Sequence, residues 1–160
     1  MALAPAGGWA RGDESYKDTL SFQSALHDLA KTGAPHAEAV LATVEGRRRA
    51  TRYIVTNFEH IPIELLVHQM LGVASCTAAL ALIDNALRQG WSVNADKITC
   101  PVRIVWGTDD KLLPWPAAAA RFRNDWPPHA DWIELEGVGH CPQLDIPRET
   151  AQLILGLTSR

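Results

Sequence analysis

Residues 102–114 read VRIVWGTDDKLLP, and residues 132–142 read WIELEGVGHCP. Each stretch begins with a short run rich in β-branched and aromatic side chains. A loop with glycine follows, and this order is typical of a strand and the turn after it. The first loop holds Asp109 and Asp110, and the second holds His140. The two stretches therefore predict two strands, at residues 102–106 and 132–135, each followed by a loop with an ionisable side chain.

Helical segments follow both predicted strands. Residues 116–126 are rich in alanine and end at a Pro-Pro pair, and Pro147 opens a final amphipathic segment. An order of strand, helix, strand, helix in so short a span predicts parallel strands joined by right-handed crossovers. A further strand end is expected at residues 3–4, before a glycine-rich turn. We therefore predict the α/β fold class, with three parallel strands at one edge of a sheet.

The segment between the strand end at residues 3–4 and the strand at residues 102–106 has a helical pattern instead. Apolar residues at helical spacing predict four amphipathic helices and no strand over residues 18–90. The predicted helices cover residues 20–30, residues 37–44, a span beginning at Pro62, and a span from Ser75 as N-cap to Gly90 as the C-terminal stop. Such a helical layer needs another surface on which to bury its apolar faces.

The loops after the two strands predict a site. The carboxyl ends of parallel strands meet at one edge of a sheet, where α/β proteins place their ligands. A carboxylate that accepts the imidazole N–H fixes the tautomer, and the other ring nitrogen then takes a proton from a hydroxyl. His140 is therefore a candidate general base. Asp110 is the preferred acid, while Asp109 is expected to stabilise the turn.

In their order and motifs these loops resemble those of the α/β-hydrolase family. GTDDKLLP fits the family pattern GxxDxxxP with the acid at Asp110, GVGH supplies the histidine, and ITCP at residues 98–101 resembles the approach to the strand. The resemblance implies strand six of that fold and its lead-in over residues 1–17, a helical cap over 18–96, and the last part of the core over 97–160. It also implies hydrolysis of an ester or related bond, as in esterases, dehalogenases, epoxide hydrolases and carbon–carbon bond hydrolases.

The family nucleophile is not found in this sequence. No G-x-S-x-G elbow occurs, and the nearest stretch, GVASC at residues 72–76, lacks the second glycine. The oxyanion-hole donors of the family follow the nucleophile and an earlier strand. We therefore expect a C-terminal fragment of a hydrolase that is inactive alone, with a serine or an aspartate nucleophile supplied by the missing N-terminal half.

Three further residues lie near the predicted site or carry reactive groups. Trp115, just beyond the acid loop, is a candidate for lining a substrate pocket, and so is His68. His68 with Glu64 is a weak metal pair because no third ligand is in view. Cys141 is expected to be structural, since no group that would activate its thiol is apparent. No metal or organic cofactor is implied.

Composition sets the remaining expectations. The chain has 160 residues, 47% hydrophobic and 21% charged, with a net charge of −3. The hydrophobic and charged fractions are those of a soluble globular protein, and the small net charge favours neither nucleic acid nor a membrane as a partner. The three scattered cysteines suit a reducing cytoplasm. The family resemblance implies a small-molecule substrate. The strand at residues 3–4 would expose a sheet edge open to the missing half or to self-association. The alternatives are a non-catalytic ligand-binding or interaction protein derived from a hydrolase, and a helical interaction module.

Overall fold

The computed structural model describes residues 1–90, 95–124 and 127–158. Its sheet has three parallel strands in the order β1-β2-β3, namely β1 Ala2–Leu3, β2 Arg103–Gly107 and β3 Asp131–Leu135. Ile104 of β2 is in register with Ala2 on one side and with Trp132 on the other. The predicted α/β class and the three parallel strands are confirmed, with strand bounds moved by one residue.

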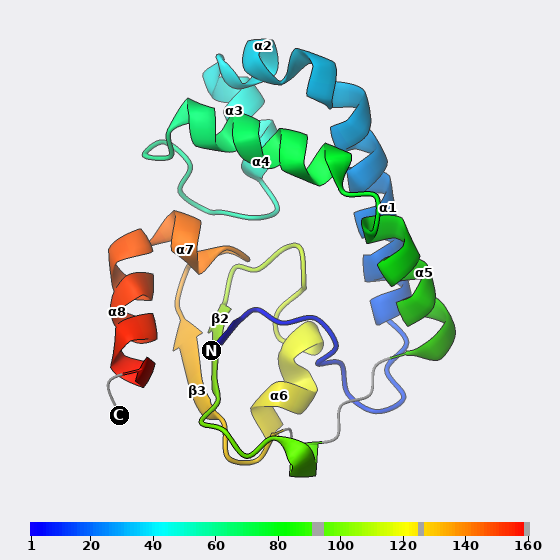
Figure 1. The fold of residues 1–160 in the computed structure, drawn as a ribbon, viewed down its shortest axis with the longest axis vertical. Helices are drawn as coiled ribbons and strands as arrows, with labels where there is room; N and C mark the ends of the chain where they lie inside the picture. Colours follow the sequence, from blue (N-terminus) through cyan, green and yellow to red (C-terminus); the bar gives the residue numbers. More distant parts are fainter. Residues whose placement is uncertain (91–94, 125–126, 159–160) are drawn as a thin grey trace.

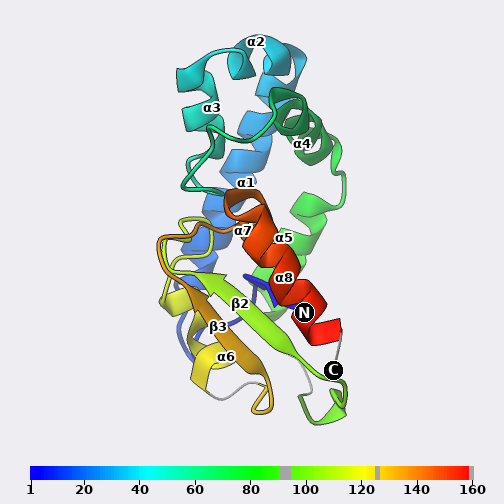
Figure 2. The same cartoon turned by 90° about the vertical axis from the view of Figure 1, so that its left-hand side faces the viewer.

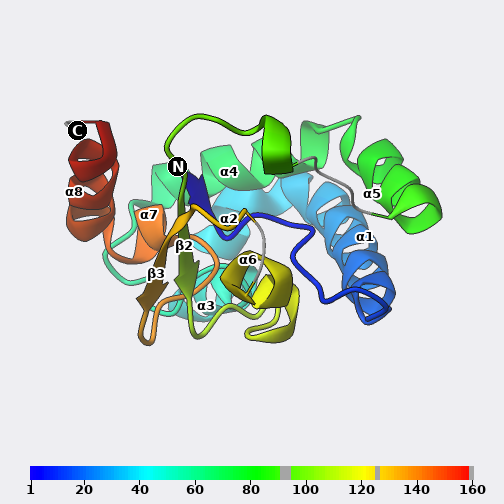
Figure 3. The same ribbon diagram turned by 90° about the horizontal axis from the view of Figure 1, so that it is seen from below.

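The central strand β2 is buried along its whole length, as expected of a parallel strand covered on both faces. On one face lies α6 Ala120–Asn124, preceded by the 3₁₀ turn Ala117–Ala119. On the other lies α8 Pro147–Thr158, as Figures 1 and 3 show. A core beneath α6 joins sheet, loop and helix residues: Ala4, Trp9, Ile104, Trp106, Leu113, Ala118 and Ala119.

The buried side chain of Arg103 attaches α8 to the sheet. Nε of Arg103 donates to Oδ2 of Asp131 at 2.8 Å, and Nη1 donates to the carbonyl oxygen of Leu153 in α8 at 2.6 Å. Arg103 is 5% exposed, so its charge is met by a carboxylate and a carbonyl rather than by water. The helix predicted from Pro147 is confirmed. The helix predicted over 116–126 is a 3₁₀ turn and a short α-helix, and residues 125 and 126 lie outside the described residues.

The span predicted to be helical contains no strand in its described residues, 18–90. Its helices, here called the helical layer, are α1 Tyr16–Gly33, the 3₁₀ turn Ala34–His36, α2 Ala37–Leu41, α3 Val44–Thr51, α4 Ile63–Ser75 and α5 Ala79–Gln89. A further 3₁₀ turn, Ala95–Lys97, precedes β2.

Two helix boundaries differ from expectation. The helix predicted over 37–44 is split, because Oγ1 of Thr43 accepts a hydrogen bond from the backbone N–H of Gly46 and caps a new helix, α3. Ser75 was expected to begin the fourth helix, but it is the last residue of α4, and α5 starts at Ala79. Gly90 ends α5 with a φ of 67°, a conformation that glycine adopts without strain.

Helices α2, α3 and α4 lie beyond the carboxyl ends of β2 and β3, while α1 and α5 run down the side of the molecule (Figures 1 and 2). A second core joins this layer to α7 Pro142–Asp145. Its buried members are Leu41, Val55, Phe58, Ile61, Leu66 and Leu144. The layer thus packs on the helix that follows the histidine loop, and its interpretation as a cap domain over residues 18–96 stays a prediction.

No single helix among the described residues is long and apolar enough to cross a bilayer. By length and composition only, α4 and α5 together meet the requirement, with a bend of 60° between them.

Candidate active site

Two loops meet at the carboxyl ends of β2 and β3. We call residues 108–114 the acid loop and residues 136–141 the histidine loop. The backbone N–H of Asp109 donates to the carbonyl oxygen of Val138 at 3.0 Å, and the N–H of Gly137 donates to Oγ1 of Thr108 at 2.9 Å. Direct hydrogen bonds therefore fix the two loops against each other.

This close approach depends on Gly107, the last residue of β2. A Cβ atom at this position would overlap the carbonyl oxygens of Val138 and Gly139. Because backbone atoms cannot move aside as a flexible side chain can, only a glycine lets the histidine loop lie so near the strand.

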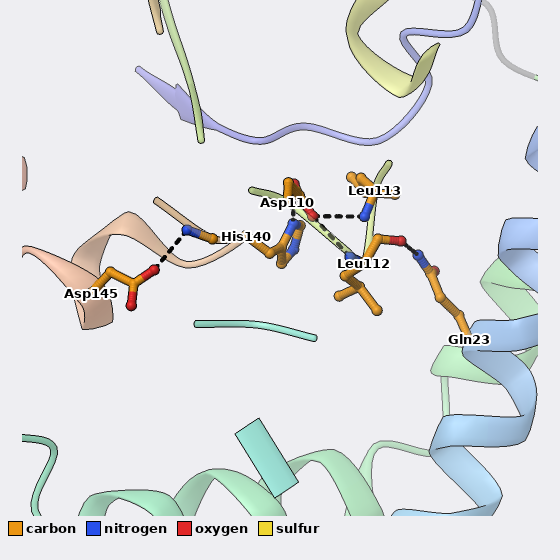
Figure 4. Close-up of polar contacts among 7 residues, drawn as sticks. Gln23, Asp110, Leu112, Leu113, His140 and Asp145 are labelled. Carbon is orange, nitrogen blue, oxygen red and sulfur yellow. Dashed lines mark hydrogen bonds and ion pairs between the residues drawn. The ribbon is translucent and has the colours of Figure 1, made fainter. Parts of the chain in front are cut away.

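Asp110 is held in one orientation by its own loop (Figure 4). Its Oδ1 accepts hydrogen bonds from the backbone N–H groups of Leu112 at 2.9 Å and Leu113 at 2.8 Å. Its Oδ2 lies 2.9 Å from Nδ1 of His140. The Asp110 side chain is fully buried, whereas Asp109 is exposed. The structure therefore places Asp110, and not Asp109, against the imidazole.

His140 presents one ring nitrogen to Asp110 and keeps the other available. Its side chain is 20% exposed, and within residues 1–90, 95–124 and 127–158 no hydrogen-bond partner of Nε2 is found. An ionised carboxylate only accepts hydrogen bonds, so in the neutral imidazole Nδ1 carries the proton and Nε2 holds a lone pair. A base in this state is able to take a proton from a hydroxyl brought to Nε2.

The neighbouring thiol is not suited to act as that nucleophile. Burial, together with the nearby carboxylates of Asp110 and Asp145, raises the pKa of Cys141 to about 11. Since the thiolate is the reactive form, Cys141 is an inert thiol at neutral pH. This fits the expectation of a structural residue.

Sequence reasoning missed a second buried carboxylate at this site. Asp145, the last residue of α7, is 4% exposed and accepts a hydrogen bond from the backbone N–H of Gly139 at 2.7 Å (Figure 4). It also accepts from the N–H groups of Thr56 and Asn57, both 2.8 Å from Oδ1. Thr56 and Asn57 belong to a loop of the helical layer, so no local sequence pattern could have indicated the contact.

The side chains of the two residues suggested for substrate binding, Trp115 and His68, make other contacts. The Trp115 ring stacks on Trp132 with centroids 6.3 Å apart, and the Arg123 guanidinium lies 5.3 Å from it. Trp115 thus packs against the core beneath α6. His68 lines an open depression of about 650 Å³ with residues of α1, α4 and the turn between α1 and α2, none of them from the acid or histidine loop. Of the four predicted site residues, Asp110 and His140 have side chains in direct contact. A substrate-binding role for Trp115 and His68 stays a prediction.

No group of three or more His, Cys, Asp or Glu side chains able to hold a metal ion occurs in the part of the chain that the structure describes. The Glu64 and His68 pair on α4 gains no third ligand there. All three cysteines are free thiols, with Cys76 and Cys100 exposed.

Comparison with known proteins shows the fold. No family model matches this sequence, and no curated protein matches it. Solved structures do match. A bacterial membrane phospholipase A superposes with a TM-score of 0.50 and 20% identity, over 76% of this chain and 40% of that one. The 2-hydroxy-6-oxo-6-phenylhexa-2,4-dienoate hydrolase of Rhodococcus sp. strain RHA1 superposes with a TM-score of 0.50 and 16% identity, over 74% of this chain and 45% of that one.

The chain thus spans less than half the length of the two proteins it resembles. At this level of identity the likeness concerns architecture, and architecture alone does not determine activity. The chain is therefore part of an α/β-hydrolase fold.

Proposed function

We propose that His140 and Asp110 are the base and the acid of a hydrolytic site whose nucleophile is supplied by another segment. The observation that carries this proposal is the 2.9 Å contact between Nδ1 of His140 and a buried Asp110 carboxylate, with Nε2 left available. Two parallel neighbouring strands hold the pair at their shared carboxyl edge, where α/β folds place their ligands.

The chemistry follows from this geometry. A hydroxyl or water held at Nε2 of His140 transfers its proton to the imidazole as its oxygen attacks the substrate carbonyl or equivalent carbon. Asp110 stabilises the imidazolium that forms, and the imidazolium then protonates the leaving group. An ester or a related bond is the substrate class that fits, and no metal or cofactor is needed for these steps.

The sheet offers a place for a segment that would supply the nucleophile. β1 pairs with β2 along one edge, and no strand among the described residues pairs with its other edge. A row of unpaired backbone groups is suited to receive another strand. A strand added there would continue the sheet, and its carboxyl-end loop would join the edge that holds Asp110 and His140.

The test is to read the coding sequence upstream of Met1 and to express the chain with any segment encoded there. Hydrolysis of a short-chain aryl ester should then fall by about 10⁴-fold when Asp110 is changed to Asn, because the imidazole takes the wrong tautomer. His140→Ala should abolish it. Activity in the longer protein that survives His140→Ala would overturn the proposal. An upstream region without a nucleophile would favour a ligand-binding derivative instead.

A further inference from the structure

The Asp145 carboxylate links two parts of the chain that are far apart in sequence. Oδ2 accepts from the N–H of Gly139 in the histidine loop at 2.7 Å. Oδ1 accepts from the N–H groups of Thr56 and Asn57, each at 2.8 Å. The last two residues belong to the loop between α3 and α4, residues 52–62, which we call the α3–α4 loop. One buried side chain thus holds the histidine loop and the helical layer together.

The bonds fall on both sides of the base. Gly139, before His140, is held by Asp145, and the N–H of Cys141, after it, donates to the carbonyl oxygen of Ile54 at 2.8 Å. The Cα of Gly139 is also closely surrounded. A Cβ built there would lie 3.0 Å from Oδ2 of Asp145 and 3.0 Å from the carbonyl oxygen of Ile54. The backbone of His140 is therefore clamped between α7 and the α3–α4 loop.

Three amide donors satisfy this carboxylate. Hydrogen bonds to an ionised acceptor are shorter and stronger than those between neutral groups. A buried carboxylate that loses its donors becomes strongly unfavourable, because water does not replace them. Displacement of the α3–α4 loop would remove two of the three donors, so the position of Asp145, and with it that of Gly139, depends on that loop.

We propose that Asp145 is a positioning residue for His140, through which the α3–α4 loop of the helical layer holds the imidazole against Asp110. The proposal rests on the function proposed above, since it assigns His140 the role of the base. It makes the geometry of the acid–base pair conditional on the docking of the helical layer. In this role Asp145 touches neither substrate nor reacting atoms.

The experiment follows the Nδ1 proton of His140 by NMR in the whole 160-residue chain. In Asp145→Asn the amide has the same shape, but its NH₂ group replaces one acceptor oxygen. It therefore faces a backbone N–H of Gly139 or of the α3–α4 loop, and one hydrogen bond is lost. We expect exchange of this proton with water to become about tenfold faster or more, because loss of a bond to a charged acceptor is worth at least that factor. An unchanged resonance and exchange rate in folded Asp145→Asn would overturn the proposal.

Asp131→Asn is the matched control. It removes the carboxylate that Arg103 binds at the start of β3, far along the strand from the histidine loop. We expect it to lower the melting temperature while leaving the His140 proton unchanged. An equal acceleration in Asp131→Asn would show that the signal reports general loss of stability, and would contradict a positioning role.

A second pair of variants approaches the same bond from the helical layer. Thr56→Ala removes the hydroxyl that donates to the carbonyl oxygen of Gly137 and keeps the backbone N–H. Thr56→Pro removes that N–H as well, and with it a donor to Asp145. We expect the His140 Nδ1 proton to exchange faster in Thr56→Pro than in Thr56→Ala. Equal exchange rates in the two variants would contradict the proposal. Loss of the native fold in both Asp145→Asn and Thr56→Pro would do so too, since the carboxylate would then stabilise the whole fold.

None of these measurements requires a nucleophile or turnover. An unchanged exchange rate of the His140 Nδ1 proton would overturn only the role of Asp145. Ester hydrolysis that survives His140→Ala in the longer protein would overturn the proposed function, so the two results are distinguishable.

Discussion

Nδ1 of His140 lies 2.9 Å from Oδ2 of Asp110, although thirty residues of sequence separate the two side chains. Each residue comes from the loop after its own strand, and β2 and β3 are neighbours in the sheet. The contact therefore depends on strand order, on the close approach permitted by Gly107, and on the turn that orients Asp110.

The chain alone should not hydrolyse a short-chain aryl ester above the buffer rate. Among the described residues no hydroxyl is bonded to Nε2 of His140, and the neighbouring thiol of Cys141 is protonated at neutral pH because burial raises its pKa to about 11. The measurement is a steady-state assay with His140→Ala and Asp110→Ala as controls. Turnover that disappears in His140→Ala would show a nucleophile within the chain, with Ser75 and Cys141 the first to be tested.

Asp110→Asn should lower the free energy of unfolding by about 1.5–3 kcal/mol, the worth of hydrogen bonds to a buried charged group. It should also turn His140 to the other tautomer, because the new amide offers an N–H where the carboxylate offered an acceptor. Urea unfolding measures the first effect and the imidazole ¹⁵N shifts measure the second. The exposed neighbour provides the control: Asp109→Asn should stay within about 0.5 kcal/mol of the wild type. Equal effects of the two changes would contradict this assignment of the acid.

Gly107→Ala should destabilise the fold by about 1–3 kcal/mol, since its Cβ would overlap two backbone carbonyl oxygens of the histidine loop. It should also separate Asp110 from His140, which the loss of the Nδ1 proton resonance would reveal. Gly72→Ala in α4 is the matched control. No atom lies within 4 Å of a Cβ at that position, so alanine there should stabilise the helix by about 0.5–1 kcal/mol. A neutral Gly107→Ala would show that the two loops are free to separate.

The Cys141 thiol should react with a disulfide reagent far more slowly than Cys76 and Cys100 at pH 8, because burial holds its pKa at about 11. The same shift links stability to pH. The folded state raises this pKa from its ordinary value of 9.0, so the contribution of the thiol to stability is complete below pH 9 and is lost as the pH rises through 11. The wild type should therefore lose more free energy of unfolding between pH 8 and pH 10 than Cys141→Ala. Parallel pH curves for the two proteins would contradict the buried thiol.

The sequence by itself determined the strands and the order of the site loops. Residues 102–106 and 132–135 are apolar and β-branched enough to predict strands, and the glycines after them mark where the loops begin. Local patterns also predicted the helical layer, since helical periodicity and capping depend on neighbours a few residues away. They misplaced the start of α5, because Ser75 is as suitable inside the end of α4 as at the start of the next helix.

Only the tertiary structure decided which side chains meet. It buried Asp110, which the sequence motif had already favoured, against His140. It also packed Trp115 on Trp132 and put His68 beside a depression away from the acid and histidine loops. It alone revealed Asp145, whose backbone donors Thr56 and Asn57 lie almost ninety residues earlier in the chain. The physical reason is that a backbone N–H has the same chemistry at every residue, so the sequence holds no record of which buried carboxylate it will bind.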